Sequence, residues 1–287
     1  MSVKTYIKKA LNFVRSKRIV YVHEVSRPYE LQVQEKGRFN GQVAVVTGAS
    51  GVIGRAIAYR LAAEGAVVYA CGTRLEKLSP VVDEINNDGF CAIPLTFSLL
   101  NESEIVENIN KVVAERGKVD LLVCCAGGGA RNEKKAFFEQ KSSVIDNVLN
   151  VNLRGTMLCT REVLKAMVPS GSGNVILISS TVGVRGMAEY AEYAAAKAGI
   201  IAFMQSIAME YGKNGVRVNC VSPGIVERGT MDEIKLERIK KTNWLGQYGK
   251  PEDIANMVAY LHSSEASFIT GQNFIVDGGR SLGLKGE

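Results

Sequence analysis

A tyrosine and a lysine four residues apart are the first residues of this sequence whose types and spacing could do chemistry. They stand in the segment EYAEYAAAKAG (189–199), where Tyr193 precedes Lys197 by four positions. On a helix this spacing puts both side chains on one face, about one turn apart. Tyr190, in the same segment, has no cation four positions further on. A phenol beside an ammonium can exchange a proton with a bound molecule, so Tyr193 is the candidate acid–base residue.

This pair needs a scaffold, and from Gln42 onward short β-rich runs alternate with longer helical stretches. The strands are nearly continuous apolar runs, which is typical of parallel sheets covered by helices on both faces. The pattern predicts an α/β fold of the Rossmann type, with a doubly wound, largely parallel seven-stranded sheet. The predicted strands are VAVVT (43–47), AVVYAC (66–71), CAIPLTF (91–97), VDLLVCCAGGG (119–129), NVILISS (174–180), VRVNCVSPG (216–224) and NFIVDGG (273–279).

Ligands of such sheets bind beyond the carboxyl ends of the strands. Five small or polar segments directly follow predicted strands and therefore belong to that edge: 48–54, 72–74, 126–129, 179–180 and 223–224. The first of these has glycines at 48, 51 and 54, between a strand and a helix. Small residues there let the backbone approach a pyrophosphate at the positive end of the helix. The turn alone is a weak signal, but its place after the first strand favours a nucleotide site.

The second strand indicates which nucleotide. Domains that bind NAD often carry an acidic residue at the end of this strand, where it bonds the adenosine ribose. Here Gly72, Thr73 and Arg74 occupy that place, and Arg55 is a second cation nearby. A guanidinium without a competing carboxylate favours a 2′-phosphate, so we expect NADP(H) to be preferred and NAD(H) to remain possible. The alternative interpretation of Arg74 is a solvated residue at a helix start.

With the glycine turn and the Tyr193–Lys197 pair in hand, residues 41–287 resemble the short-chain dehydrogenase/reductase family. TGASGVIG (47–54) is similar to its glycine motif, and CCAG (124–127) stands where the family usually has Asn-Asn-Ala-Gly. Asn152 in NVNLRG matches the family's asparagine. Ser180 precedes Tyr193 by thirteen residues, as the family's catalytic serine usually does. RVNCVSPG (217–224) and GQNFIVDGG (271–279) are likewise typical in place and composition.

The resemblance implies hydride transfer between a nicotinamide and a ketone or secondary alcohol, without a metal. It implies that Tyr193 transfers the proton, that Lys197 supplies a cation and bonds the nicotinamide ribose, that Ser180 donates to the substrate oxygen, and that Asn152 holds a relay water. The expected cofactor-binding residues are Gly48, Ser50, Gly51, Ile53, Gly54, Thr73, Arg74, Ser98, Ala126, Gly127, Tyr193, Lys197, Pro223 and Gly224. The substrate is expected to be a 3-oxoacyl compound or a sugar ketone, and the protein a homodimer or homotetramer.

Some residues depart from the family pattern. Val52 stands where a glycine is usual, so its side chain must point away from the pyrophosphate or the loop must be rebuilt. Cys124 and Cys125 replace two asparagines, and thiols are poor hydrogen-bonding groups. Ser98 replaces an acid that usually contacts adenine. We therefore expect weaker cofactor binding than usual. Two alternatives stay open: a non-catalytic nucleotide sensor or scaffold, and an NAD-dependent alcohol dehydrogenase.

Substrate contacts are expected from residues 225–249, where the family has its lid. Met231, Trp244, Leu245 and Tyr248, with Met187 and Tyr190, are its candidate apolar lining. The basic segment ARNEKKAFFEQK (130–141) is either a contact for an acidic substrate or acyl carrier, or a solvated loop.

Residues 1–40 form a basic extension before the predicted domain at 41–287. They hold nine Lys or Arg and three Asp or Glu, which accounts for the whole formal charge of +6. The neutral remainder gives no indication of nucleic-acid binding. Ile7, Ala10, Leu11 and Val14 can form one face of an amphipathic helix. Contact with a membrane surface or an anionic polymer, packing on another subunit, and a mobile arm all remain open. Six scattered cysteines without a metal or disulfide pattern, and the lack of an apolar leader, favour the cytoplasm.

Overall fold

The computed structural model describes residues 37–128, 133–227, 229 and 233–283. The predicted amphipathic helix at Ile7–Val14 lies outside the described residues. Phe39, which we assigned to the extension, is fully buried in the core, and Arg38 beside it pairs with buried Glu64. Packing of the domain therefore includes residues 38 and 39, while the role of the extension stays a prediction.

Seven parallel strands form one sheet, in the order β3-β2-β1-β4-β5-β6-β7. This confirms the predicted Rossmann-type fold, with every strand pair parallel. β1 and β4 are neighbours although two strands separate them in sequence, so the winding reverses between them and leaves a binding edge at their carboxyl ends. The strands are β1 (Val43–Thr47), β2 (Val67–Gly72), β3 (Ala92–Thr96), β4 (Leu121–Cys124), β5 (Gly173–Ile178), β6 (Val216–Pro223) and β7 (Asn273–Val276).

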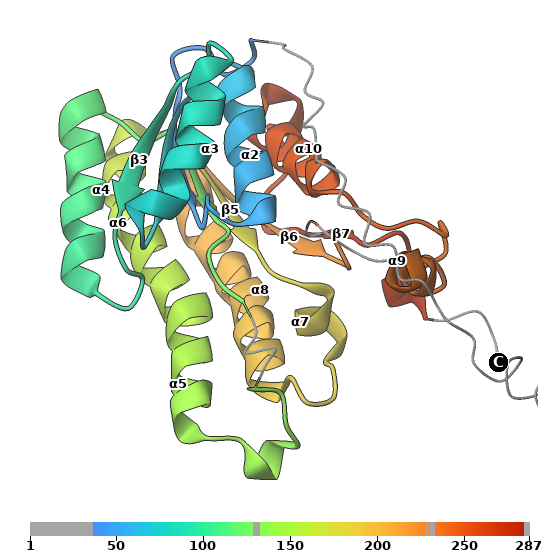
Figure 1. Cartoon of the computed structure of the whole chain (residues 1–287). Coiled ribbons are helices and arrows are strands. Elements are labelled where there is room, and N and C mark those ends of the chain that lie inside the picture. The colour runs from blue at the N-terminus through green and yellow to red at the C-terminus, as the bar shows by residue number, and fades with distance from the viewer. Residues whose placement is uncertain (1–36, 129–132, 228, 230–232, 284–287) are drawn as a thin grey trace, which may run out of the picture.

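Two helical layers cover the sheet (Figure 1). One layer holds α2 (Val52–Ala63), α3 (Leu75–Asn87) and α10 (Pro251–His262), and the other α4 (Glu102–Arg116), α6 (Gly155–Ser170) and α8 (Ala191–Tyr211). Along β1, Val46 packs into the first layer and Val45 into the second. All five residues of β1 are buried, because a parallel strand with helices on both faces has no solvent side.

Shorter elements complete the site edge. α5 (Ser142–Leu149) continues through a π-helical turn (Asn150–Arg154) into α6, and α7 (Thr181–Arg185) precedes α8. α9 (Glu233–Lys240) lies in the predicted lid segment. Short 3₁₀ turns occur at Phe137–Glu139, Gly212–Asn214, Ser264–Ala266 and Arg280–Leu282. Several predicted strands end earlier than expected, among them β4 at Cys124, β5 at Ile178 and β7 at Val276. The residues that follow β4 and β5 turn into the site.

Candidate active site

A cavity of about 480 Å³ lies at the carboxyl ends of the central strands. Most of the residues that the sequence assigned to catalysis or cofactor binding border it, and Asn152 and Arg74 are the exceptions. The bordering predicted residues are Gly48, Ser50, Gly51, Ile53, Gly54, Thr73, Ser98, Ala126, Gly127, Ser180, Tyr193, Lys197, Pro223 and Gly224. Ser179, which the sequence placed at this edge, also borders the cavity. So do residues that sequence reasoning missed, among them Thr47, Cys71, Phe97, Leu99, Val151 and Ile178.

The turn after β1 depends on two of its three glycines. Gly48 has a φ of 70°, and a Cβ there would lie 2.6 Å from Ala126 Cα. A Cβ on Gly54 would collide with the Gly48 carbonyl. Gly51 is the N-cap of α2 and leaves more room. The turn therefore brings backbone amides and the positive end of α2 to the cavity, which suits a phosphate.

Val52 opens α2 and borders the same cavity, with 37% of its surface exposed. Both alternatives for Val52, a side chain directed away from the pyrophosphate and a rebuilt loop, stay predictions. The loop accommodates Val52 because Gly51, one residue earlier, takes the N-cap position with an ordinary extended backbone, φ −85° and ψ 158°.

Thr47 ties β1 to the turn after β4. Its Oγ1 accepts hydrogen bonds from the backbone amides of Cys125 at 3.2 Å and Ala126 at 3.1 Å. These bonds do not depend on the side chains at 124 and 125, so cysteines are tolerated there. Burial raises the pKa of the Cys124 thiol to about 12, and Cys124 therefore acts as a small apolar residue.

Lys197 is almost fully buried beneath Tyr193. Its Nζ donates to the Ile178 carbonyl at 2.8 Å, and Ser179 Oγ donates to the Lys197 carbonyl at 2.7 Å. The Nζ lies 5.7 Å from the centre of the Tyr193 ring. Burial lowers the pKa of Lys197 to about 8. The structure thus places a buried amine beside the phenol ring.

Ser180 and Tyr193 face the cavity from two elements. Ser180 is the N-cap of α7, and its Oγ accepts from the Val182 amide at 3.2 Å. That bond uses a lone pair, so the hydroxyl proton can still be donated. Tyr193 stands in the first turn of α8 and is half-buried. α7 packs closely here because Gly183 has no side chain: a Cβ on Gly183 would lie 2.6 Å from the Lys197 carbonyl carbon.

Asn152 lies beside the site without bordering the cavity. It lies in the π-turn, where its Nδ2 donates to the Gly128 carbonyl at 3.1 Å and the Val148 carbonyl at 2.9 Å. Its Oδ1 is buried without a hydrogen-bond partner. Gly127, at φ 137°, explains the arrangement: a Cβ there would collide with Asn152 Oδ1 and lie 3.6 Å from Lys197 Nζ. A buried acceptor normally has a donor, so this spot suits a water molecule between the amide and the lysine.

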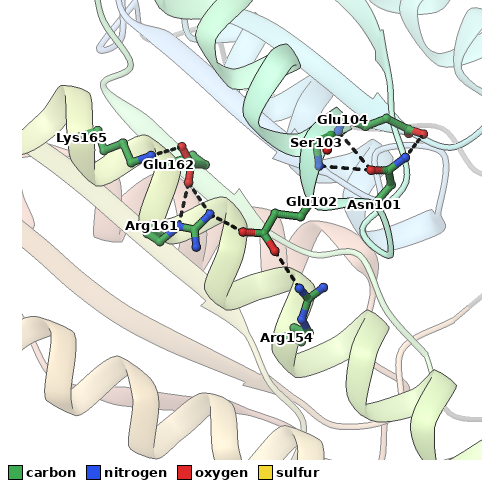
Figure 2. A network of polar contacts seen from close by, with 8 residues as sticks. All are labelled: Asn101, Glu102, Ser103, Glu104, Arg154, Arg161, Glu162 and Lys165. Atoms are coloured by element: carbon green, nitrogen blue, oxygen red, sulfur yellow. Dashed lines mark hydrogen bonds and ion pairs between the residues drawn. The ribbon is translucent and has the colours of Figure 1, made fainter.

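Ion pairs lie on the outer side of the π-turn. Glu102, at the start of α4, lies between Arg154 and Arg161 and contacts both, at 2.7 and 2.9 Å (Figure 2). Arg161 also pairs with Glu162, which meets Lys165 on its other side. α4 and α6 are thereby connected at the level of Asn152.

At the other end of the cavity, the two predicted cations differ. Arg55 is bound by Glu84 through both Nε and Nη2, so it is not a free cation. Arg74 is exposed at the N-cap of α3, beside the bordering residue Thr73. Ser98 borders the cavity, and its Oγ accepts from the Leu100 amide at 3.2 Å.

The described residues that we expected to line the substrate site do not border this cavity. Leu245 and Tyr248 border a neighbouring cavity of about 360 Å³ beyond β6 and β7. Trp244 donates from Nε1 to the Gly283 carbonyl, and Met187 is half exposed. Met231 lies outside the described residues. Lys134 and Glu189 join the segments before α5 and α8 by an ion pair of 3.0 Å.

The part of the chain that the structure describes contains no cluster of three or more His, Cys, Asp or Glu side chains arranged to hold a metal ion. None of its helices combines the length and the apolar character that spanning a membrane requires.

Comparisons with known proteins agree with this geometry. Residues 48–281 match the sequence model of a family described as Enoyl-(Acyl carrier protein) reductase. The chain is 37% identical over 243 residues to a 3-oxoacyl-(acyl-carrier-protein) reductase FabG of Rickettsia bellii, covering 84% of this chain and 97% of the relative. It is 38% identical over 245 residues to Nodulation protein G of a Rhizobium species, with 84% and 98% covered.

Solved structures extend the match to three dimensions. A putative gluconate dehydrogenase from Agrobacterium tumefaciens superimposes with a TM-score of 0.80 at 29% identity, covering 88% of this chain and all of that one. A short-chain type dehydrogenase/reductase from Mycobacterium ulcerans gives 0.79, also at 29% identity, with 85% and 91% covered. The chain belongs to the short-chain dehydrogenase/reductase family and is a nicotinamide-dependent oxidoreductase that acts on carbonyl or CH–OH groups.

Proposed function

We propose that this protein is an NADP(H)-preferring reductase of ketones, of the 3-oxoacyl or sugar-ketone type. The observation that carries the proposal is that Ser180, Tyr193 and Lys197 border one cavity, with the Asn152 amide directed at Lys197 from behind. No single pair among these residues would be specific. Their arrangement at the positive end of α2 supports proton transfer next to a bound dinucleotide.

The residues present fit such a cofactor. The backbone around Gly48 and Gly54 is too tightly packed for a Cβ at either position. This tight turn leaves the amides at the α2 N-terminus available to a pyrophosphate. Gly127 and Lys197 border the same cavity, which suits a ribose beside the lysine. When bound, the nicotinamide supplies the hydride.

The chain's own residues then supply the proton and stabilise the charge. Tyr193 donates its proton to the substrate oxygen during reduction, and Ser180 donates a hydrogen bond to the same oxygen. Lys197 stabilises the phenolate that results, and its pKa of about 8 lets it pass a proton on near neutral pH. Asn152 Oδ1 accepts from the water that we place between it and Lys197, completing a path for the proton.

The preference for NADP(H) rests on Arg74. The end of β2 offers no carboxylate, and Arg74 is exposed next to the cavity. A guanidinium binds a phosphate more strongly than a hydroxyl, so it distinguishes the two cofactors. Arg55 does not contribute, because Glu84 already neutralises it.

A cofactor titration tests this step. Nicotinamide fluorescence with NADPH and NADH should be followed for the wild type, Arg74→Ala and Lys77→Ala. Lys77 is an exposed cation on the same helix, three residues further on, and serves as the matched control. We expect Arg74→Ala to weaken NADPH binding about tenfold, the loss of one charge-assisted phosphate contact. NADH binding and the control should change less than twofold. Equal losses for both cofactors would refute the preference and favour an NAD-dependent alcohol dehydrogenase.

Turnover of a substrate panel distinguishes an enzyme from a nucleotide sensor. The sensor remains the second candidate because Val52, where the family usually has a glycine, borders the cavity that must hold the phosphates. NADPH oxidation should be measured with a 3-oxoacyl thioester and with a keto sugar. Tight NADPH binding without turnover of either compound would favour the sensor.

We also propose that the protein forms a homo-oligomer through the α6–α8 groove, which is bordered by Met157, Leu158, Leu164, Val168, Pro169, Phe203, Ile207 and Tyr211. The groove is apolar, with Arg161 and Lys165 at its rim, and these two cations are held in place by Glu102 and Glu162 (Figure 2). An exposed apolar surface of this kind suits the same surface of a second copy. Phe203→Glu should lower the mass measured by light scattering. An unchanged oligomer would exclude the groove as the interface.

None of the six cysteines, all within the described residues, forms a disulfide, and this supports our proposal of a cytoplasmic location. Fractionation of cells that make the tagged protein tests it, and recovery with secreted or membrane material would overturn it.

A further inference from the structure

We propose that Thr156 is a positioning residue for proton transfer: its buried hydroxyl fixes the Asn152 carbonyl in the π-turn and thereby keeps the Asn152 amide directed at Gly127 and Lys197. The proposal rests on the proposed function, because it concerns the same proton path. Thr156 does not border the cavity, and neither its position nor its type identifies it in the sequence.

The starting observation is the backbone of the π-turn. The Gly155 amide donates to the Asn150 carbonyl, five residues back, in the middle of an otherwise continuous helix from α5 to α6. Such turns are rare and often occur at functional sites. The wider turn interrupts the regular ladder, and other groups must stabilise it. Asn152 Nδ2 contributes by donating to the Val148 carbonyl, which lies four residues back, where a backbone amide bonds in a regular helix.

Thr156 stabilises the same residue from its backbone. Its Oγ1 donates to the Asn152 carbonyl at 2.7 Å, and the side chain is 2% exposed. Asn152 is therefore fixed at three points: its carbonyl by Thr156, and its amide nitrogen by the Val148 and Gly128 carbonyls. The one polar atom left without a partner is Oδ1, which is the atom that faces Gly127 and Lys197.

A second threonine separates this role from ordinary helix bonding. Thr160 Oγ1 donates to the Thr156 carbonyl at 2.8 Å, and Thr160 is fully buried. Thr160 makes the same kind of bond within regular α6, and its acceptor, the Thr156 carbonyl, lies one turn beyond Asn152. Threonine bonds of this kind bend helices slightly. Only the bond of Thr156 ends on the residue that serves the site.

The ion pairs around Glu102 do not provide an equivalent hold. Glu102, Arg154 and Arg161 are each about half exposed, and exposed pairs of this kind contribute little to stability (Figure 2). The Thr156 hydroxyl is buried, so no water replaces it as a donor to the Asn152 carbonyl when it is removed. We therefore assign the positioning to Thr156.

Three variants of the full chain test the assignment: Thr156→Val, Thr156→Ser and Thr160→Val. Valine keeps the shape of threonine and removes the hydroxyl, whereas serine keeps the hydroxyl. We expect Thr156→Val to lower kcat about tenfold or more, because a small displacement of a proton-transfer group is costly. KM for NADPH should stay within twofold, and the pH profile of kcat should shift. Thr156→Ser should recover most of the loss, and Thr160→Val should keep kcat within about twofold.

Amide hydrogen exchange gives a second readout that needs no turnover. Thr156→Val should speed exchange at residues 148–152, and Thr160→Val should not. Unchanged exchange at residues 148–152 in Thr156→Val would overturn the proposal. This readout is independent of turnover, so it holds even if the proposed function fails and neither the wild type nor the variants turn over a ketone. Equal losses of kcat in Thr156→Val and Thr160→Val, with an unshifted pH profile, would show that Thr156 is merely structural. Failure of Thr156→Ser to recover kcat would overturn it as well.

Discussion

Strand β5 joins two regions in which a buried base lies beside an orphaned amide oxygen. At its carboxyl end, Lys197 donates to the Ile178 carbonyl, and Asn152 Oδ1 nearby has no partner. At its amino end, Asn174 lies next to His262, and Asn174 Oδ1 and His262 Nε2 are both buried without a partner. Burial lowers the pKa of both bases, to about 8 for Lys197 and about 4 for His262.

The two regions differ in what surrounds the base. Around Lys197, Gly127 and Gly183 let Asn152 and α7 pack closely, and the cavity is bordered by both Lys197 and Tyr193. Around His262, the ring of Phe39 packs at a centroid distance of 4.7 Å, and Arg217 donates to the backbone carbonyls of His262 and Ser263 at the end of α10. A shifted pKa is thus common to both, and only the carboxyl end combines it with access for a ligand. The comparison shows why a perturbed base alone does not identify an active site.

Among the variants at the two ends of β5, Lys197→Met should lower turnover the most. Loss of the amine should lower kcat by about 10²- to 10⁴-fold, the usual share of acid–base catalysis. Stability should not fall accordingly. The folded-state pKa of about 8 lies below the unfolded value, so the unfolded chain holds this proton more tightly. The resulting cost, about 3 kcal/mol, is fully present below pH 8 and is relieved as the pH rises towards 10.5.

Urea denaturation at pH 7 measures this second effect. Lys197→Met should be at least as stable as the wild type, and Lys213→Met, at an exposed lysine, should change neither activity nor stability. A variant destabilised by several kcal/mol at pH 7 would contradict the view that burial of the amine is costly to the fold.

Gly127→Ala should have the next largest effect. The methyl group would meet Asn152 Oδ1, and alanine disfavours a φ of 137°. We expect a destabilisation of about 1–3 kcal/mol and a loss of kcat of at least about tenfold. Gly128→Ala is the matched control, because its backbone is unstrained and a Cβ there meets nothing within 4 Å. Similar losses in both variants would mean that the space beside Lys197 is not special.

His262→Phe should have the smallest effect on turnover, with kcat unchanged at pH 7.5. Its effect should appear in acid. Because the folded-state pKa of His262, about 4, is below the unfolded value of 6.5, the wild type loses up to about 3 kcal/mol from this group as the pH falls from 6.5 to 4. Asp120 and Glu64 oppose this loss, and Arg217 and Arg38 add to it. The free energy of unfolding, measured between pH 4 and 6.5, should fall less steeply in His262→Phe than in the wild type. An equal slope would contradict the lowered pKa of His262.

Much of the fold was predictable because its signals are local. The apolar runs marked all seven strands, and Gly48, with Gly54, marked the turn after β1. Helix spacing alone paired Tyr193 with Lys197. Strand ends were less predictable: Ser179 continues the apolar run NVILISS in sequence, yet its hydroxyl leaves the sheet to bond α8.

Other features depend on contacts between distant segments, which sequence spacing does not show. Glu84, 29 residues away in sequence, pairs with Arg55. The position of Arg55 near the glycine turn therefore made it a candidate phosphate-binding cation that the fold does not leave free. The support that Thr47 gives to Cys125, and the space left by Gly183, exist only once the strands and helices meet. The π-turn before Thr156 likewise has no periodicity that separates it from the surrounding helix.

The most direct test of the account compares wild type and Tyr193→Phe in two assays on the same samples: NADPH binding by fluorescence and NADPH oxidation with a 3-oxoacyl thioester. The account predicts that both proteins bind NADPH within about twofold of each other, and that the variant loses about 10²- to 10⁴-fold of the wild-type turnover. Equal turnover in the two proteins would contradict the assignment of proton transfer to Tyr193. Tight binding without turnover by the wild type would contradict the reductase itself.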